Sequence, residues 1–116
     1  LMRTITGKVV RIKESKTKDD KAKIIWFSLR DGESLFSLHT DFSVAEHFLE
    51  RVKLKDRIIV QALETNMGLR AVAIEKNHRN IPIFIGNRIE KDDSYIEAAK
   101  KITASARSKH PRLFVD

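Results

Sequence analysis

The fold is decided by the stretch Lys23-Ile-Ile-Trp-Phe-Ser-Leu-Arg30-Asp31-Gly32-Glu-Ser-Leu-Phe-Ser-Leu-His39. Apolar and β-branched residues dominate both halves, which predicts two strands at 23–30 and 33–39. The Asp-Gly pair between them indicates a tight hairpin turn, because such a turn needs a positive φ that glycine adopts freely. The stretch also carries the only tryptophan of the chain. We therefore expect an aromatic β-hairpin at this place.

Strand alternation then assigns the hairpin side chains to two faces. If the apolar side chains Ile25, Phe27 and Leu29 point into a core, an outer set remains, consisting of Trp26, Ser28 and Arg30 with Ser37 and His39 on the next strand. A register shifted by one residue would bury Trp26 and expose Phe27 instead. We expect Trp26 on the outer face, with the shifted register as the alternative.

Further elements are expected on both sides of the hairpin. They are a long strand at 2–13, a polar loop at 14–22, a helix at 41–52, and strands at 56–64 and 69–75. Apolar residues of the first strand change face after Val9, which indicates a bulge, and Gly7 allows a close approach of another strand. Either Asp41 or Ser43 can cap the helix.

The order of these elements indicates the architecture. Three strands, a helix and two further strands follow the plan of a five-stranded antiparallel OB-type barrel with a helix between strands three and four. We therefore expect a mainly β fold, with this barrel as one domain at 1–76. Residues 77–116 would form a C-terminal extension with its own elements.

The extension has three expected parts. Residues 81–85 alternate but contain a proline, which is typical of an edge strand or an extended arm. A capping-box pattern opens a helix at 94–109, and an apolar tip follows at 113–115. These parts could pack on the barrel, or form a homodimer or partner surface through 81–116. The sequence leaves both alternatives open.

The composition points to a soluble, basic protein. The chain of 116 residues has 23 Lys and Arg against 16 Asp and Glu, a net charge of +7. Such a charge favours polyanions, although it is also typical of a solubilising surface. No cysteine is present, so disulfides and thiolate metal sites are excluded, and we expect a cytoplasmic location. No apolar run reaches the length of a membrane span, so no membrane partner is expected.

Residues 5–76 resemble a cold-shock domain, a small OB-type barrel that binds single-stranded RNA and DNA. The likeness rests on these segments: Gly7-Lys8-Val9-Val10, the aromatic second strand ending in Ser28-Leu29, Asp31-Gly32 followed by Leu35-Phe36-Ser37-Leu38-His39, Asp56-Arg57-Ile58-Ile59-Val60, and Thr65-Asn-Met-Gly68-Leu-Arg-Ala71-Val72-Ala-Ile74. The resemblance implies that Trp26 is a stacking aromatic, that His39 matches the histidine of the third strand, and that Lys8 is a basic contact. Departures from the family pattern at Arg11, Ile12, Phe27, Ser28 and Ser37 indicate a divergent cold-shock-like domain or a general OB domain.

The expected binding site joins the outer face with nearby bases. Trp26 and His39 would stack bases, beside Ser28 and Ser37, while phosphates would be neutralised by Lys8, Arg11, Lys23 and Arg30. The lysine-rich loop 13–23 could flank the same groove or could simply be solvated. Three further bases, Lys53, Lys55 and Arg57, are expected to be solvated surface charges.

Catalysis and metal binding have little support in the sequence. Ser37, His39 and Asp41 are spaced two residues apart on one expected strand, so they would lie in a row and not converge on one point. The four histidines fall on separate elements, and no glycine-rich phosphate loop is present. We expect no enzyme, no catalytic residues, no metal and no cofactor.

The function expected from the sequence is binding of single-stranded nucleic acid, with RNA somewhat favoured over DNA by the family resemblance. An alternative is an OB-fold protein-interaction module that uses the C-terminal extension or a sheet edge. A weaker alternative is a binder of polyanions or membrane surfaces through charge alone.

Overall fold

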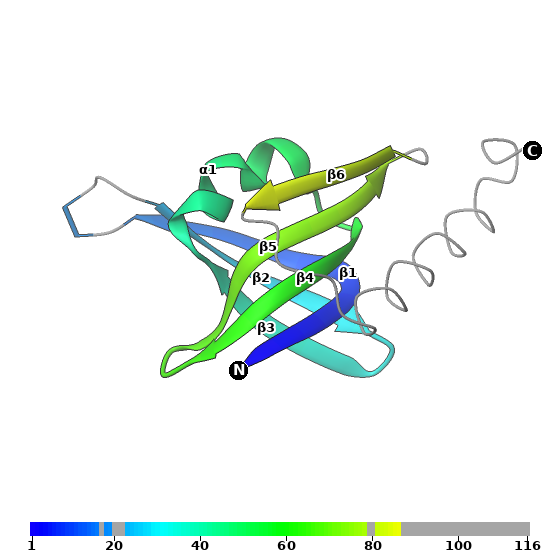
Figure 1. The fold of residues 1–116 in the computed structure, drawn as a ribbon, viewed down its shortest axis with the longest axis horizontal. Coiled ribbons are helices and arrows are strands. Elements are labelled where there is room, and N and C mark those ends of the chain that lie inside the picture. The colour runs from blue at the N-terminus through cyan, green and yellow to red at the C-terminus, as the bar shows by residue number, and fades with distance from the viewer. Residues whose placement is uncertain (17, 20–22, 79–80, 87–116) are drawn as a thin grey trace, which may run out of the picture.

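The structure is a computed structural model that describes residues 1–16, 18, 19, 23–78 and 81–86. Its elements are β1 (Met2–Lys16), β2 (Lys23–Asp31), β3 (Ser34–Thr40), α1 (Phe42–Arg51), β4 (Arg57–Thr65), β5 (Gly68–His78) and β6 (Ile81–Gly86). Figure 1 shows the strands curving into a barrel. The predicted order of three strands, a helix and two strands is confirmed, and a sixth strand follows.

Closure of the barrel makes the sheet mixed. The strand order is β3-β2-β1-β4-β5-β6, with an additional pairing of β3 with β5. Every neighbouring pair is antiparallel except β3 and β5, which are parallel. The predicted purely antiparallel barrel is wrong on this point for a simple reason. When five strands alternate in direction, the first and the last run the same way, so the pairing that closes the barrel is parallel.

Strand β1 serves both sides of the barrel. Its first half pairs with β4 and its second half with β2, and Lys8 pairs with both. The register shifts between Val9 and Arg11, so the predicted bulge is confirmed. Gly7 lies against β2, where an added Cβ would stand 2.8 Å from the backbone oxygen of Arg30. This contact confirms the predicted close approach.

β1 is longer than expected, and its end forms a two-stranded ribbon with the start of β2. β1 continues to Lys16, which pairs with Lys23 at the start of β2, so the predicted loop 14–22 is wrong at its first three residues. A protruding two-stranded ribbon has no core to face, and its polar sequence therefore does not prevent strand pairing. Figure 1 shows this ribbon extending away from the barrel. At the other end of β2, Gly32 has a φ of 61° in the tight turn to β3, as predicted.

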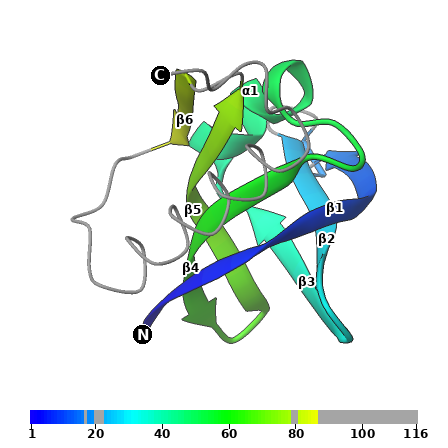
Figure 2. The same cartoon turned by 90° about the vertical axis from the view of Figure 1, so that its right-hand side faces the viewer.

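The core lies inside the barrel and under α1. Ile25, Phe27 and Leu29 are all at most 2% exposed, which confirms the predicted inward face of β2. The ring of Phe27 packs on Phe48 of α1, with 4.9 Å between ring centroids. Figure 2 shows α1 at one end of the barrel. Burial of these side chains is the main stabilising contribution of the fold.

The start of α1 is capped by one of the two predicted residues. The Oδ1 atom of Asp41 accepts hydrogen bonds from the backbone N–H of Val44 at 3.0 Å and from the hydroxyl of Ser43 at 2.7 Å. α1 has only ten residues, well short of the roughly 20 that a spanning helix needs. In the part of the chain that the structure describes, no helix could cross a membrane.

The first part of the extension joins the sheet. β6 pairs with residues 73–78 of β5, along the same edge of β5 whose first residues pair with β3. Ile85 is 3% exposed in the core, and the guanidinium of Arg51 donates to the backbone oxygen of Phe84 at 3.0 Å. The predicted edge strand is therefore present, packed on the barrel. The helix expected at 94–109 and the tip at 113–115 lie outside the described residues.

Candidate nucleic-acid interface

Trp26 lies on the outer face of β2. Its side chain is 36% exposed, whereas those of its neighbours Ile25 and Phe27 are buried. Its cross-strand partners are Lys13 on β1 and His39 on β3. The predicted register is thus confirmed, and the alternative that buries Trp26 is excluded.

A shallow pocket of about 290 Å³ surrounds this indole. Its lining consists of Arg11, Lys13, Ser15, Trp26, Phe27, Ser28, Ser37 and Leu38. We call this pocket the Trp26 groove. It brings together four of the predicted site residues, namely Trp26, Arg11, Ser28 and Ser37. Two lining residues are cations and none is an acid, so the groove has a positive potential.

Lys13 and Ser15 are not among the predicted site residues, although the predicted loop 13–23 that contains them could flank the groove. The signal was nevertheless present, because the bulge after Val9 places odd-numbered residues on the outer face from Arg11 onward. Lys13 then lies directly opposite Trp26.

His39 supports the indole and does not offer a second open ring. Its ring lies 5.1 Å from that of Trp26 between centroids, with 38° between planes. The side chain is only 5% exposed, because β5 closes on β3 here and places Arg70 opposite His39. The prediction that both rings stand free to stack bases therefore needs correction for His39.

The chemistry of His39 follows from this position. Burial, and secondarily the positive charge of Arg70, lower the pKa of His39 below its usual value of 6.5. The imidazole is therefore neutral at physiological pH, and it adds no positive charge beside Trp26. Its contribution is the packing of a neutral ring against one edge of the Trp26 site.

Two serines also line the groove, Ser28 on β2 and Ser37 on β3. Ser28 pairs with Arg11 on one side and with Ser37 on the other. Their hydroxyls can donate and accept hydrogen bonds. The Trp26 groove therefore combines an aromatic surface, two cations and two small hydroxyl groups within one outer face.

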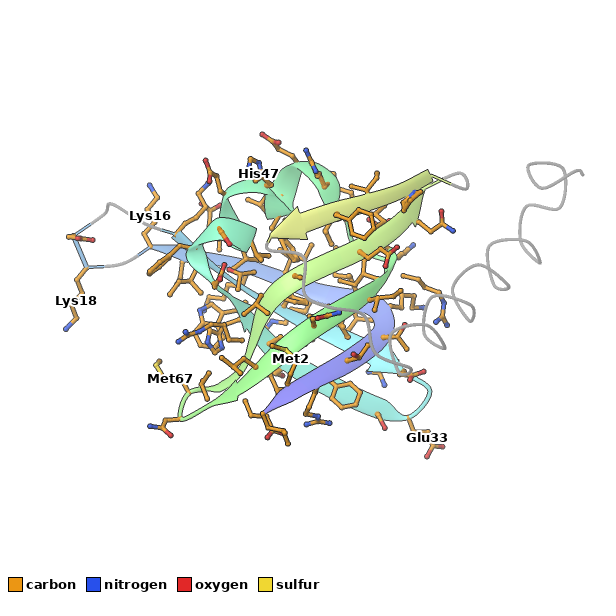
Figure 3. The ribbon with its side chains drawn as sticks, viewed as in Figure 1. Met2, Lys16, Lys18, Glu33, His47 and Met67 are labelled. Carbon is orange, nitrogen blue, oxygen red and sulfur yellow. The ribbon has the colours of Figure 1, made fainter. Side chains whose placement is uncertain are left out.

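The remaining predicted bases lie elsewhere. Lys8 and Arg30 pair with each other, four residues along β2 from Trp26, and neither lines the groove. Lys23 lies toward the other end and forms an ion pair with Glu14 at 3.5 Å. In Figure 3, Lys16 and Lys18 extend into solvent near the tip of the β1–β2 ribbon. The predicted single cluster of bases around Trp26 is thus divided among three places.

Neither a triad nor a metal site emerges from the polar residues. The carboxylate of Asp41 is engaged at the start of α1, and Ser37 lies two residues before His39 on β3. Among the described residues, no group of three or more His, Cys, Asp or Glu side chains could hold a metal ion. Ser37, His39 and Asp41 therefore do not form a convergent set, in keeping with their spacing in the sequence.

Comparisons with models of protein families and with curated proteins return no match.

Proposed function

We propose that the chain is a non-enzymatic module that binds single-stranded nucleic acid, RNA ahead of DNA, through the outer face of β1, β2 and β3. The observation that carries this proposal is the exposed Trp26 in a groove with two cations and no acid. An exposed aromatic beside bases is the arrangement that single-strand binders use, because every base has a flat face to stack. The preference for RNA rests on the cold-shock resemblance of residues 5–76.

The proposed division of labour follows from the geometry. A base stacks on Trp26, while Arg11 and Lys13 neutralise the adjoining phosphates. The hydroxyls of Ser28 and Ser37 face the sugar or the base edge. Stacking on one aromatic ring is worth about 1–3 kcal/mol per base. Bases inside a duplex are already stacked and paired, so this groove favours single strands.

A fluorescence titration tests the proposal, because Trp26 is the only tryptophan. We expect hexauridylate to quench its emission, and the affinity to fall as salt rises because phosphate contacts release counterions. Trp26→Ala, followed by a label-based readout, should weaken binding by roughly 5- to 150-fold, the equivalent of about 1–3 kcal/mol. That loss should persist at every salt concentration.

Matched controls separate this site from general charge attraction. Met67→Ala removes an apolar side chain that is 71% exposed in the β4–β5 turn and should leave the affinity unchanged. Duplex RNA and heparin should bind more weakly than the single strand. Equal binding of all three polyanions would favour a charge-only binder. An unresponsive Trp26 in a chain that oligomerises with concentration would instead favour the protein-interaction alternative.

A further inference from the structure

Three cations form a row across β2, β1 and β4. Lys8 lies opposite Arg30 on β2 and opposite Arg57 on β4, because β1 changes partners at this residue. The neighbours Val9, Leu29 and Ile58 are buried, so the three bases share the opposite face of the sheet, where Lys8 and Arg30 are exposed and Arg57 is half-buried. Like charges placed directly opposite on neighbouring strands destabilise a sheet. The row therefore carries an unfavourable interaction that an anion would relieve.

No ion pair involves the row in the described part of the chain. There the side chains of Lys8, Arg30 and Arg57 have no ion pair and no hydrogen bond. The Nε atom of Arg57 is buried without a hydrogen-bond partner. The nearby carboxylate of Asp56 is engaged, since its Oδ2 atom accepts from Lys76 Nζ at 2.7 Å and from the Lys53 N–H at 2.8 Å. Among the described residues, the guanidinium groups of Arg30 and Arg57 thus have donors without a partner, and guanidinium donors match phosphate oxygens well.

We propose that Arg30, Lys8 and Arg57 form a second phosphate-binding site on the strand whose base stacks on Trp26. The inference rests on the proposed function and extends it to the length of the bound strand. Arg30 lies four residues from Trp26 on the same face of β2, a distance of about 13 Å at roughly 3.3 Å per residue. The serine part of the Trp26 groove lies between them, so one surface connects the two sites.

This distance sets the length of nucleic acid required. A stacked strand advances about 3.4 Å per nucleotide, so at most about four nucleotide steps separate Trp26 from the row, and fewer if the strand is extended. A dinucleotide with one phosphate reaches the Trp26 groove only. A hexanucleotide reaches both sites.

The test compares UpU with hexauridylate in titrations of the full chain. Arg57→Gln and Lys8→Gln should each lower the affinity for hexauridylate about fivefold at 0.1 M salt and reduce the slope of log affinity against log salt by about 0.7. Neither substitution should change the affinity for UpU. Arg3→Gln is the matched control, because it removes one charge from β1 at a position where Arg3 pairs with Glu64 at 3.6 Å.

The outcomes distinguish this inference from the proposed function. If wild-type protein binds hexauridylate and both substitutions leave that affinity unchanged, the second site is wrong and the Trp26 site stands. Equal losses for UpU and hexauridylate, or an equal loss with Arg3→Gln, would also overturn it, since they indicate a general effect of charge. If wild-type protein binds neither oligonucleotide, both proposals fail together.

Discussion

At the scale of single residues, Trp26 and His39 form one unit with two different roles. The indole is partly exposed, and the imidazole beside it is buried and neutral. An aromatic side chain that already packs on a neighbour has less rotational freedom to lose when a base stacks on it. The burial of His39 therefore positions Trp26, and it also makes the stability of the fold depend on pH.

Replacement of His39 should change that pH dependence. The pKa of His39 is lower in the folded state than its usual 6.5, so the unfolded chain takes up the proton more readily. The contribution of neutral His39 to the free energy of unfolding is complete above pH 6.5 and decreases as pH falls toward the folded-state pKa. We expect urea titrations between pH 8 and pH 5 to show a smaller loss of stability for His39→Gln than for the wild type.

His47 provides the control for this experiment. It lies exposed on α1, where Figure 3 shows it pointing away from the barrel. His47→Gln should leave the wild-type pH profile intact. If both substitutions alter the profile equally, the effect does not arise from the burial of His39.

At the scale of elements, β1 controls the outer face. Its bulge after Val9 turns Arg11, Lys13 and Ser15 outward, and the groove exists because of that change. Just before the bulge, Gly7 packs closely against β2 at the point where β1 changes its pairing partner from β4 to β2. The same strand therefore shapes the barrel and supplies the groove with its cations.

Gly7→Ala tests the close contact directly. The added Cβ would stand 2.8 Å from the backbone oxygen of Arg30, an atom that cannot move without shifting β2. We expect the free energy of unfolding to fall by about 1–3 kcal/mol, the usual cost of overpacking. Urea denaturation would measure the change, with Thr4→Ala as the control on the same strand. A neutral or stabilising effect of Gly7→Ala would show that β1 and β2 can separate at this point without cost.

At the scale of the whole molecule, the fold keeps packing and the candidate interface on different parts of its surface. α1 contacts β2, β3, β5 and β6, and it fills one end of the barrel with Phe48. β6 extends the sheet beside β5 and α1. The Trp26 groove, by contrast, is lined by β1, β2 and β3, so a ligand there would not compete with the packing of β6.

Ile85→Ala tests whether β6 belongs to the cooperative fold. Ile85 is 3% exposed and lies in the same core as Phe48. Truncation should lower the free energy of unfolding by about 2–5 kcal/mol, as for other buried aliphatic side chains. Ile83→Ala, at a half-buried position of the same strand, should cost less. Equal and negligible effects of both substitutions in thermal melts would mean that the barrel is stable without β6.

The amino-acid sequence by itself determined the features that depend on neighbours along the chain. Alternation at 25–29 identified the buried face of β2, the change of pattern after Val9 indicated the bulge, and Asp41 was one of two expected caps. Each depends on the periodicity of one strand or on hydrogen bonds within a few residues. Local chemistry is sufficient for these features.

Only the tertiary structure decided which residues lie side by side across the barrel. It buried His39 through the closure of β3 on β5, placed Lys13 opposite Trp26, and moved Lys8 and Arg30 into a row with Arg57. The parallel pairing of β3 with β5 and the pairing of β6 with β5 were also decided only at this level. The physical reason is that side-by-side contacts depend on the register between strands far apart in the chain. Alternation within one strand determines a face, whereas the cross-strand register determines its neighbours.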